Sequence, residues 1–205
     1  MLGLFGGTFD PIHYGHLSAA WQAYQTLGLR QLRLMPCHLP PHRAASKASS
    51  RQRLMMLKLA IQNIPEFVID ERELHSEDLS YTVNSLTQIR EEIGDEPLCL
   101  LVGLDNQLAS WHQPEKLIQL AHLVFVNRPE HALVRNAFFD SLLKKEVQDP
   151  AQLAHSPQGL VYFLNNPTLT ISSTLIRNLY AQEQSPRFLL PDAVLDYINT
   201  EQLYE

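Results

Sequence analysis

The stretch Gly6-Gly7-Thr8-Phe9-Asp10-Pro11-Ile12-His13-Tyr14-Gly15-His16 decides the fold through the patterns on either side of it. Before it stands the apolar run 2–5, which suits a strand buried on both faces. After it, apolar residues recur at spacings of three and four over 17–27 until Gly28, as in an amphipathic helix that ends at a glycine. A glycine-rich turn there lets the backbone approach an anion closely, near the positive end of the helix dipole. The sequence therefore predicts a phosphate-binding turn after the first strand.

The same alternation of strand and helix continues along the chain. Further apolar runs suited to buried strands occupy residues 32–35, 67–69, 98–102, 123–126 and 160–164. Helical patterns lie between them at 53–64, at 82–93 behind Ser80 and at 116–121 behind Pro114, and two more helices, 172–180 and 191–198, come last. Strands joined by crossover helices form a parallel sheet. We therefore expect one α/β domain, residues 1–205, with a Rossmann-like doubly wound parallel sheet and a small helical portion at about 172–205.

Charge is divided unevenly along the 205 residues. The total is −6, but residues 1–65 hold seven basic residues and only Asp10 as an acid, a net charge of +6, and the rest of the chain carries −12. The composition, 45% hydrophobic and 19% charged, is typical of a soluble globular protein. The acidic total argues against broad adhesion to nucleic acid or membrane, whereas the basic third can still face a small polyanion. Arg30, Arg33 and Lys58 fall outside the motifs, so only part of this charge is expected to reach a ligand.

Cysteine content and hydropathy indicate the compartment. Cys37 and Cys99 are too few for a disulfide framework and lack the spacing of a zinc site, so we expect reduced thiols. The longest apolar stretches, such as 98–102, are far shorter than the roughly 18–20 residues of a membrane span. The N-terminus shows no leader-peptide pattern. A cytoplasmic location is therefore expected.

The turn at 6–16 also narrows the chemistry. It is neither the GxGxxG of dinucleotide-binding folds nor a P-loop, so redox dinucleotide binding and Walker-type hydrolysis are disfavoured. His13 and His16 are three residues apart and share a face of the first helical turn, so both can point at one ligand. Two other roles stay open for them. One is a zinc or iron pair, for which only Asp10 stands nearby as a further ligand, and the other is helix capping.

A second candidate anion site lies behind the last expected strand, in Thr170-Ile171-Ser172-Ser173-Thr174-Leu175-Ile176-Arg177. Ser172 or Ser173 is a suitable N-cap, and a capped helix start presents N–H groups to an anion. Arg177 follows Ser173 by four residues and Thr174 by three, so it projects from the face of the cap. Taken alone, such a segment is more commonly a capped surface helix with a solvated arginine.

Together the two segments resemble the nucleotidylyltransferase superfamily. His13-Tyr14-Gly15-His16 is similar to its (T/H)xGH motif and 170–177 to its ISSTxIR motif, and the resemblance to the bacterial nicotinate-nucleotide adenylyltransferase branch runs from Leu2 to the C-terminus. It implies that both histidines contact the phosphates of ATP, with His16 as the main catalytic group at the α-phosphorus. It also implies that the second motif holds the phosphates that leave as pyrophosphate. The implied ATP-binding residues are Gly6, Gly7, Thr8, Phe9, His13, His16, Ser172, Ser173, Thr174 and Arg177.

A third group of residues fits a second substrate. Ser80-Tyr81-Thr82 stands at an expected helix start, and Gly103-Leu104-Asp105 with Trp111 follows the fourth strand, where parallel sheets bind ligands. Without the family, these are a capped helix and a partly buried tryptophan. The resemblance implies that Thr82 and the backbone near Trp111 hold a nicotinate carboxylate and that Asp105 binds ribose hydroxyls. It further implies that Trp111 stacks on the cationic pyridine ring, a contact worth roughly 0.5–2 kcal/mol.

The irregular segment 36–50 belongs to the same expected site. A loop of about fifteen residues in a compact domain is commonly a ligand-binding loop or lid. Pro40-Pro41-His42-Arg43 resembles the PPHK element of the family, with arginine in place of lysine. The arginine still supplies a cation that can bind phosphate, now as a planar guanidinium group. Arg128-Pro129 also matches a family position. The implied mononucleotide-binding residues are His42, Arg43, Tyr81, Thr82, Asp105, Trp111 and Arg128.

The resemblance implies an adenylyltransferase that converts nicotinate mononucleotide and ATP to nicotinate adenine dinucleotide (deamido-NAD) and pyrophosphate, in NAD biosynthesis. Mg²⁺ is expected on the ATP phosphates, because this ion prefers few protein carboxylates and keeps its waters. The expected partners are the two nucleotides, without nucleic acid or membrane. Two alternatives stay open. One is another superfamily member, such as pantetheine-phosphate adenylyltransferase or a cytidylyltransferase, which lacks the third group of residues. The other is a nucleotide-sensing binding module that has lost turnover.

Overall fold

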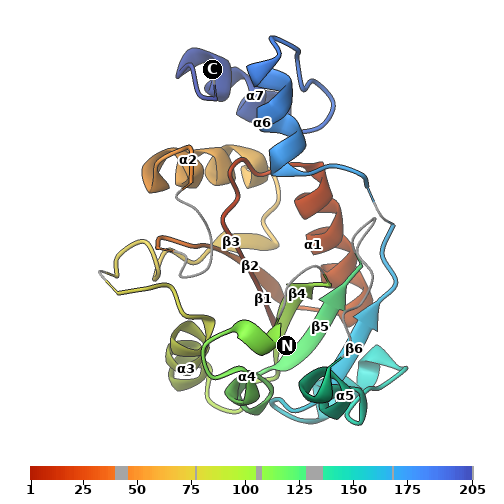
Figure 1. The fold of residues 1–205 in the computed structure, drawn as a ribbon. Coiled ribbons are helices and arrows are strands. Elements are labelled where there is room, and N and C mark those ends of the chain that lie inside the picture. Colours follow the sequence, from red (N-terminus) through yellow and green to blue (C-terminus); the bar gives the residue numbers. More distant parts are fainter. Residues whose placement is uncertain (40–45, 77, 105–107, 128–135, 168, 205) are drawn as a thin grey trace.

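The computed structural model describes residues 1–39, 46–76, 78–104, 108–127, 136–167 and 169–204. These residues build a six-stranded parallel sheet with helices on both faces (Figure 1). Across the sheet the order is β3-β2-β1-β4-β5-β6. The strands are β1 (Leu2–Gly7), β2 (Gln31–Pro36), β3 (Phe67–Ile69), β4 (Leu98–Gly103), β5 (His122–Val126) and β6 (Val161–Leu164). The doubly wound parallel sheet predicted from the sequence is confirmed.

Two apolar clusters join the helices to the sheet. One includes buried residues of α1 (Tyr14–Leu27), α2 (Ser50–Ile61) and α7 (Asp192–Thr200). The other includes buried residues of α3 (Thr82–Ile93), α4 (Pro114–Leu120) and α5 (Ala137–Leu143). Because the central strands are buried on both faces, β4 and β5 consist of continuous buried residues instead of an alternating pattern.

β1 lies where the order of the strands reverses. The chain runs from β1 through β2 to β3 at one edge, and then returns to place β4 on the other side of β1. In open parallel sheets, ligands bind at the carboxyl ends of the strands that flank such a reversal. The 6–16 turn leaves β1 at that point. Figure 1 shows α6 (Ser173–Ala181) and α7 beyond the same end of the sheet, next to α2 and the start of α1.

Most elements follow the prediction, and the differences are local. α2 begins three residues earlier than expected, because Ser49 and Gln52 form a capping box at its start. Gly6 and Gly7 are the last residues of β1 and do not follow the strand as expected. Nothing in the apolar spacing predicted α5 or the short 3-10 helices η1 (Leu108–Ser110) and η2 (Pro150–His155). These helices span only three to seven residues and so display little of a helical period, and α5 lacks the proline that marks the start of the equally short α4.

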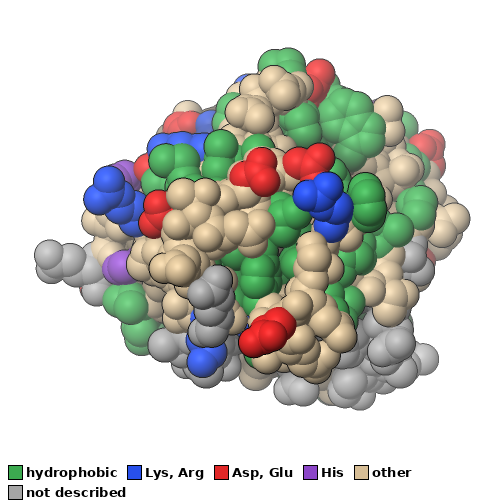
Figure 2. Space-filling model, turned by 90° about the horizontal axis from the view of Figure 1, so that it is seen from above, with side chains coloured by type: hydrophobic (Ala, Val, Ile, Leu, Met, Phe, Trp, Pro, Cys, Tyr) green, Lys and Arg blue, Asp and Glu red, His purple; other side chains and the backbone are tan. Residues whose placement is uncertain are grey.

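Acids from later in the chain match part of the positive charge of the N-terminal third. Arg30 Nη2 donates to Glu96 Oε2 at 2.8 Å, and Lys58 Nζ lies 3.0 Å from Glu71 Oε1. Neither pair includes a motif residue. Figure 2, which looks down on the end of the molecule that carries α6 and α7, shows acidic and basic side chains mixed on that face. The positive segment of the sequence therefore does not become a uniformly positive surface at this end.

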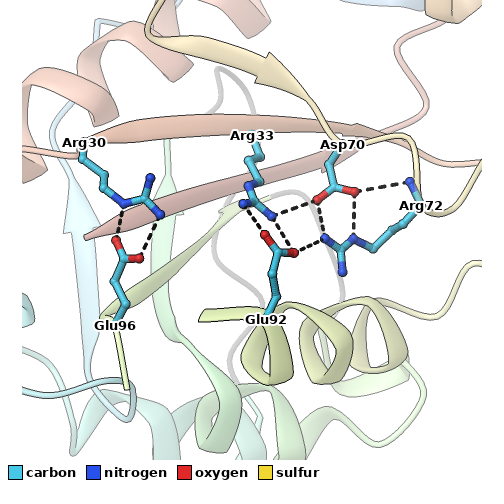
Figure 3. Close-up of polar contacts among 6 residues, drawn as sticks. All are labelled: Arg30, Arg33, Asp70, Arg72, Glu92 and Glu96. Carbon is cyan, nitrogen blue, oxygen red and sulfur yellow. Dashed lines mark hydrogen bonds and ion pairs between the residues drawn. The ribbon is translucent and has the colours of Figure 1, made fainter. Parts of the chain in front are cut away.

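A network of two arginines and two acids joins the sheet to α3 (Figure 3). Arg33 on β2 donates to Glu92 Oε1 at 2.6 Å, and Arg72 Nε donates to Asp70 Oδ1 at 2.7 Å. Arg72 also reaches Glu92 at 3.0 Å and Arg33 reaches Asp70 at 3.4 Å, so each arginine contacts both acids. Hydrogen bonding from Arg33 lowers the pKa of Glu92 to about 2. Arg33 is thus a structural cation, which agrees with its position outside the motifs.

The two cysteines agree with the sequence prediction. Cys37 and Cys99 are both thiols and do not form a disulfide. Cys99 is buried in β4, and burial raises the pKa of its thiol to about 12, so it is a poor nucleophile. Among the described residues, no helix has the length and apolar character needed to cross a membrane.

Candidate active site

The first motif forms a tight turn between β1 and α1. A Cβ at Gly7 would lie 3.0 Å from the ring of Phe9, so a larger residue would press on that ring. Phe9 adopts a φ of +49°, a left-handed conformation that is uncommon outside glycine and is found at functional turns. Its side chain is buried and packs edge-on against His16, with ring centroids 5.1 Å apart. Phe9 thus supports His16 from the core, and its contact with ATP stays a prediction.

The two histidines of the motif lie side by side. Their ring centroids are 3.8 Å apart and their planes differ by 30°. His13 is the N-cap residue of α1 and His16 lies in the first turn, so the predicted shared face is confirmed. The His13 side chain makes no capping hydrogen bond, which removes capping as its role. Gly15 permits the arrangement, because a Cβ there would lie 2.9 Å from the His13 ring and 3.1 Å from the Ile171 carbonyl.

The start of α6, which carries the second motif, is joined to the first motif. Ser172 caps this helix, as predicted, by accepting a hydrogen bond from the Leu175 backbone at 3.1 Å. Ser173 donates its hydroxyl proton to the Pro11 carbonyl at 2.9 Å. The starts of α1 and α6 therefore lie next to each other, as Figure 1 also shows.

Arg177 makes a further link between the motifs. Its guanidinium donates to the Asp10 carbonyl at 2.6 Å and to the Thr174 hydroxyl at 3.2 Å. The contact with Thr174 confirms that the two side chains share a face of α6. The alternative of a merely solvated arginine is wrong, because Arg177 is held against the turn of the first motif.

Two buried polar side chains support this turn from the core. The Asp10 carboxylate is 5% exposed and accepts hydrogen bonds from the backbone N–H groups of Lys47 and Ala48 at 2.8 and 3.2 Å. Arg53 on α2 is fully buried and donates to the Thr8 carbonyl at 2.7 Å. Burial lowers the pKa of its guanidinium. A buried cation therefore stands directly behind the glycine-rich turn.

A pocket opens beside the histidines. It is lined by His13 and Gly15 of the first motif, Phe5 of β1, Gly103 at the end of β4 and Ile171 just before α6, among others. The pocket thus lies between the two motifs, at the carboxyl ends of the central strands. This is the position at which doubly wound sheets bind nucleotides.

Three of the residues expected to bind the second substrate lie close together at the start of α3 and beside α4. The rings of Tyr81, the N-cap residue of α3, and His112 lie 4.4 Å apart. Trp111, next to His112, is half-buried and packs, like Tyr81, on the apolar cluster beneath α3 and α4. Thr82 is the first residue of α3 and is half-buried. The structure therefore brings Tyr81, Thr82 and Trp111 into one region.

Ser80 has a different role from the helix cap that its position suggested. Tyr81 occupies the N-cap position of α3, without a side-chain capping bond. The Ser80 hydroxyl oxygen accepts hydrogen bonds from the backbone N–H groups of His38 and Leu39, at 3.1 and 3.2 Å. Ser80 thus fixes the chain just before the Pro-Pro-His-Arg segment.

Four expected site residues lie outside the described parts of the chain: His42, Arg43, Asp105 and Arg128. Their roles stay predictions. Within the described ranges, no group of three or more His, Cys, Asp or Glu side chains could hold a metal ion. The zinc or iron alternative for His13 and His16 therefore finds no third protein ligand in that part of the chain.

Three residues at this end of the molecule were not singled out in the sequence. Tyr204 donates its hydroxyl proton to Asp10 Oδ1 at 2.7 Å, across 194 positions of the chain. Asn166, after β6, accepts a hydrogen bond from the Asn127 backbone at 2.9 Å, and both line the pocket. Of the three, only the burial of Arg53 could have been predicted from the sequence, because its neighbours on the same face of α2 are apolar and buried.

Comparisons with known proteins agree with this arrangement. The family model described as cytidylyltransferase-like matches residues 4–179. A protein of Methylococcus capsulatus named "Probable nicotinate-nucleotide adenylyltransferase" is 46% identical over 208 residues, which cover all of this chain and 99% of that protein. A protein of the same name from Cellvibrio japonicus is 47% identical over 206 residues, which cover 99% of this chain and 98% of that protein.

Solved structures share the fold. Nicotinic acid mononucleotide adenylyltransferase of Plasmodium falciparum, complexed with NaAD, matches with a TM-score of 0.75 and 20% identity, covering 99% of this chain and 96% of that one. Its complex with APC matches over the same shares with a TM-score of 0.73 and 21% identity. The chain thus belongs to the cytidylyltransferase-like family of nucleotidyltransferases. Within that family, it belongs with the nicotinate-nucleotide adenylyltransferases.

Proposed function

We propose that this protein transfers the adenylyl group of ATP to nicotinate mononucleotide, giving nicotinate adenine dinucleotide and pyrophosphate in NAD biosynthesis. The observation that carries the proposal is the docking of Ser173 and Arg177 onto the first motif, beside the paired histidines. The relatives reported above bear the name of this activity, and the fold neighbour was solved with NaAD and with APC.

ATP would bind between the two motifs. Gly6, Gly7 and Thr8 would bring the backbone to the phosphates, at the turn that Phe9 supports. His13 and His16 would donate to the α-phosphate oxygens as negative charge builds there, with His16 contributing most. Ser172, Thr174 and Arg177 would hold the phosphates that leave. Because the Ser173 hydroxyl proton is directed at Pro11, Ser173 would offer its backbone N–H.

The reaction needs no covalent enzyme intermediate. A 5′-phosphate oxygen of the mononucleotide forms a bond to the α-phosphorus of ATP, the bond from that phosphorus to the bridging oxygen breaks, and pyrophosphate leaves in line. This oxygen is already anionic, so the protein need not supply a general base. Its task is to bring two anions together and to stabilise the charge that develops. The histidines, Arg177 and the buried Arg53 would provide positive potential for it.

The mononucleotide would bind at the region shared by Tyr81, Thr82 and Trp111. Trp111 would stack on the pyridine ring, and Thr82, at the start of α3, would meet the nicotinate carboxylate near the N-terminal end of a helix dipole. Tyr81 would line the same side through its contact with His112. Asp105 would bind ribose hydroxyls, and the remaining contacts would come from His42, Arg43 and Arg128.

Mg²⁺ fits this site as a companion of ATP. Asp10, which belongs to the phosphate turn, has a carboxylate that accepts hydrogen bonds from Lys47, Ala48 and Tyr204, so we do not assign it to the ion. When bound to the phosphates, Mg²⁺ would neutralise part of their charge while keeping most of its waters. The single domain and the cytoplasmic location are further parts of this proposal.

A substrate comparison with the purified protein tests the proposal. ATP and Mg²⁺ are combined with either nicotinate or nicotinamide mononucleotide, and both dinucleotide and pyrophosphate are measured. We expect both products in equal amounts, faster with the nicotinate form. Pyrophosphate release that needs a phosphopantetheine as acceptor, or CTP in place of ATP as donor, would assign the protein to another branch. Nucleotide binding without turnover would identify it as a binding module.

A further inference from the structure

The Asp10 carboxylate joins three segments that are distant in the sequence. It accepts hydrogen bonds from the backbone of Lys47 at 2.8 Å and Ala48 at 3.2 Å, and from the Tyr204 hydroxyl at 2.7 Å. The carbonyl group of the same residue accepts the bond from Arg177. Asp10 itself belongs to the first motif. One residue therefore connects the phosphate turn to α6, to the chain before α2 and to the C-terminal segment.

Tyr204 is held firmly in this contact. Its φ of +72° places a non-glycine residue in the left-handed region, where the surroundings must compensate for the strain. Burial, together with the neighbouring Asp10 carboxylate, raises the pKa of its hydroxyl, so the hydroxyl stays a hydrogen-bond donor. The ring of Tyr180 on α6 lies 6.1 Å from that of Tyr204. The hydroxyl is thus directed at Asp10 by a packed environment.

We propose that Tyr204 is a positioning residue for adenylyl transfer, acting through Asp10 on the turn that carries His13 and His16. A buried carboxylate is costly unless donors surround it, and Tyr204 supplies one of its three donors among the described residues. Without that donor, the Asp10 carboxylate loses one hydrogen bond, and the position of the turn becomes more variable. The inference rests on the proposed function, because positioning is measured as turnover.

The test compares two tyrosines that each lose only a hydroxyl group. Tyr204→Phe removes the bond to Asp10. Tyr180→Phe, the matched control, removes a bond to Asn199 at 3.0 Å in the same helical portion. We expect Tyr204→Phe to lower kcat about tenfold with KM values changed less than about twofold, because small misplacement affects the reacting geometry more than binding. Tyr180→Phe should stay within about twofold in kcat. Equal kcat values for the two variants would overturn the proposal.

A double-variant cycle tests whether Tyr204 acts through Asp10. Asp10→Ala and Asp10→Ala/Tyr204→Phe are measured beside the single Tyr204→Phe variant, because alanine, unlike asparagine, leaves no acceptor for the Tyr204 hydroxyl. If the hydroxyl works only through this carboxylate, the double variant loses little more kcat than Asp10→Ala alone. Losses that simply multiply would contradict the mechanism, even if each variant is slow.

A measurement without substrates separates this inference from the proposed function. Hydrogen exchange at the Lys47 and Ala48 amides reports directly on the two backbone bonds to Asp10. We expect faster exchange there in Tyr204→Phe and unchanged exchange in Tyr180→Phe. Unchanged exchange in Tyr204→Phe overturns the role of the contact. Absence of dinucleotide synthesis by the unaltered protein overturns the proposed function instead.

Discussion

The imidazole rings of His13 and His16 lie with their centroids 3.8 Å apart, one at the N-cap of α1 and the other in its first turn. Such close rings can reach the oxygens of a single phosphate group. They are backed by different neighbours, because His16 packs on Phe9 and His13 lines the pocket. Both rings are buried, with His13 2% and His16 8% exposed, and the pair meets the pocket through His13.

Replacing His16 should separate catalysis from folding. His16→Ala should lower kcat by on the order of 10²–10³, the loss expected when one strong donor to the transition state is removed. The KM values should change little by comparison, and the lost packing on Phe9 should lower the melting temperature without unfolding the protein at the assay temperature. Turnover is followed as dinucleotide formed from ATP and nicotinate mononucleotide, and a kcat near that of the unaltered protein would remove His16 from the mechanism.

The buried His122 provides a control for the loss of an imidazole. Its Nε2 lies 2.8 Å from the Ser156 carbonyl and its Nδ1 accepts a bond from the Leu160 backbone at 3.1 Å, so its role is structural. His122→Ala should cost about 1–3 kcal/mol of unfolding free energy, because the Leu160 N–H loses its partner. The kcat of the folded enzyme should be retained, in contrast to His16→Ala. A large loss of kcat without loss of stability would contradict this assignment.

Replacing Trp111 should change the KM for the mononucleotide more than the KM for ATP. Trp111→Ala removes the indole face proposed for the pyridine ring, so the KM for the mononucleotide should rise about tenfold while that for ATP stays nearly constant. Trp21→Ala is the control, because Trp21 on α1 packs against Tyr24 and Phe67. Equal changes in both KM values would indicate that Trp111 is only structural.

The network around Glu92 should stabilise the protein above acidic pH. Its pKa is lowered from 4.5 to about 2, first by the hydrogen bond from Arg33. A lowered pKa means that the stabilisation is present above 4.5 and is lost as pH falls toward about 2. Because Glu92 is 46% exposed, the gain over Glu92→Gln should be at most about 1 kcal/mol. Unfolding in urea across this range measures it.

Glu91 is the matched control for that experiment. It is the adjacent glutamate on α3 and is also exposed. Both substitutions remove one carboxylate from the same helix, and Glu92→Gln should give the flatter pH dependence of unfolding below about pH 4.5. High salt should reduce the difference between the two variants, because exposed ion pairs are screened. The same pH profile in both variants would show that the network contributes nothing.

The parts of the fold that could be predicted are those in which neighbours in sequence are neighbours in space. β4 and β5 are buried on both faces, so their continuous apolar residues indicate parallel strands directly. The two histidines and the Ser172 cap depend on spacings of three residues along one helix start. Such local relationships can be recognised in the amino-acid sequence alone.

The parts that could not be predicted depend on contacts between distant segments. The Asp10–Tyr204 bond joins residues 194 positions apart, and the two links from α6 to the first motif span more than 160 positions. The sequence correctly placed Arg33 outside the motifs, but it did not identify the partners of Arg33. Asp70 and Glu92 come close to Arg33 only when β2, β3 and α3 pack together. A single sequence does not show which distant residues are in contact.

Glu73 should make stability fall as pH rises. Its side chain is 6% exposed and accepts the Ser85 hydroxyl at 2.7 Å, and burial raises its pKa above 4.5. A raised pKa means that the folded state prefers the protonated form, so the advantage of the unaltered protein over Glu73→Gln is greatest below 4.5 and declines as pH rises through the folded pKa. Unfolding in urea from about pH 4 to about pH 8 measures that difference. A difference that is constant, or that grows with pH, would show that Ser85 and the neighbouring donors outweigh the cost of burial.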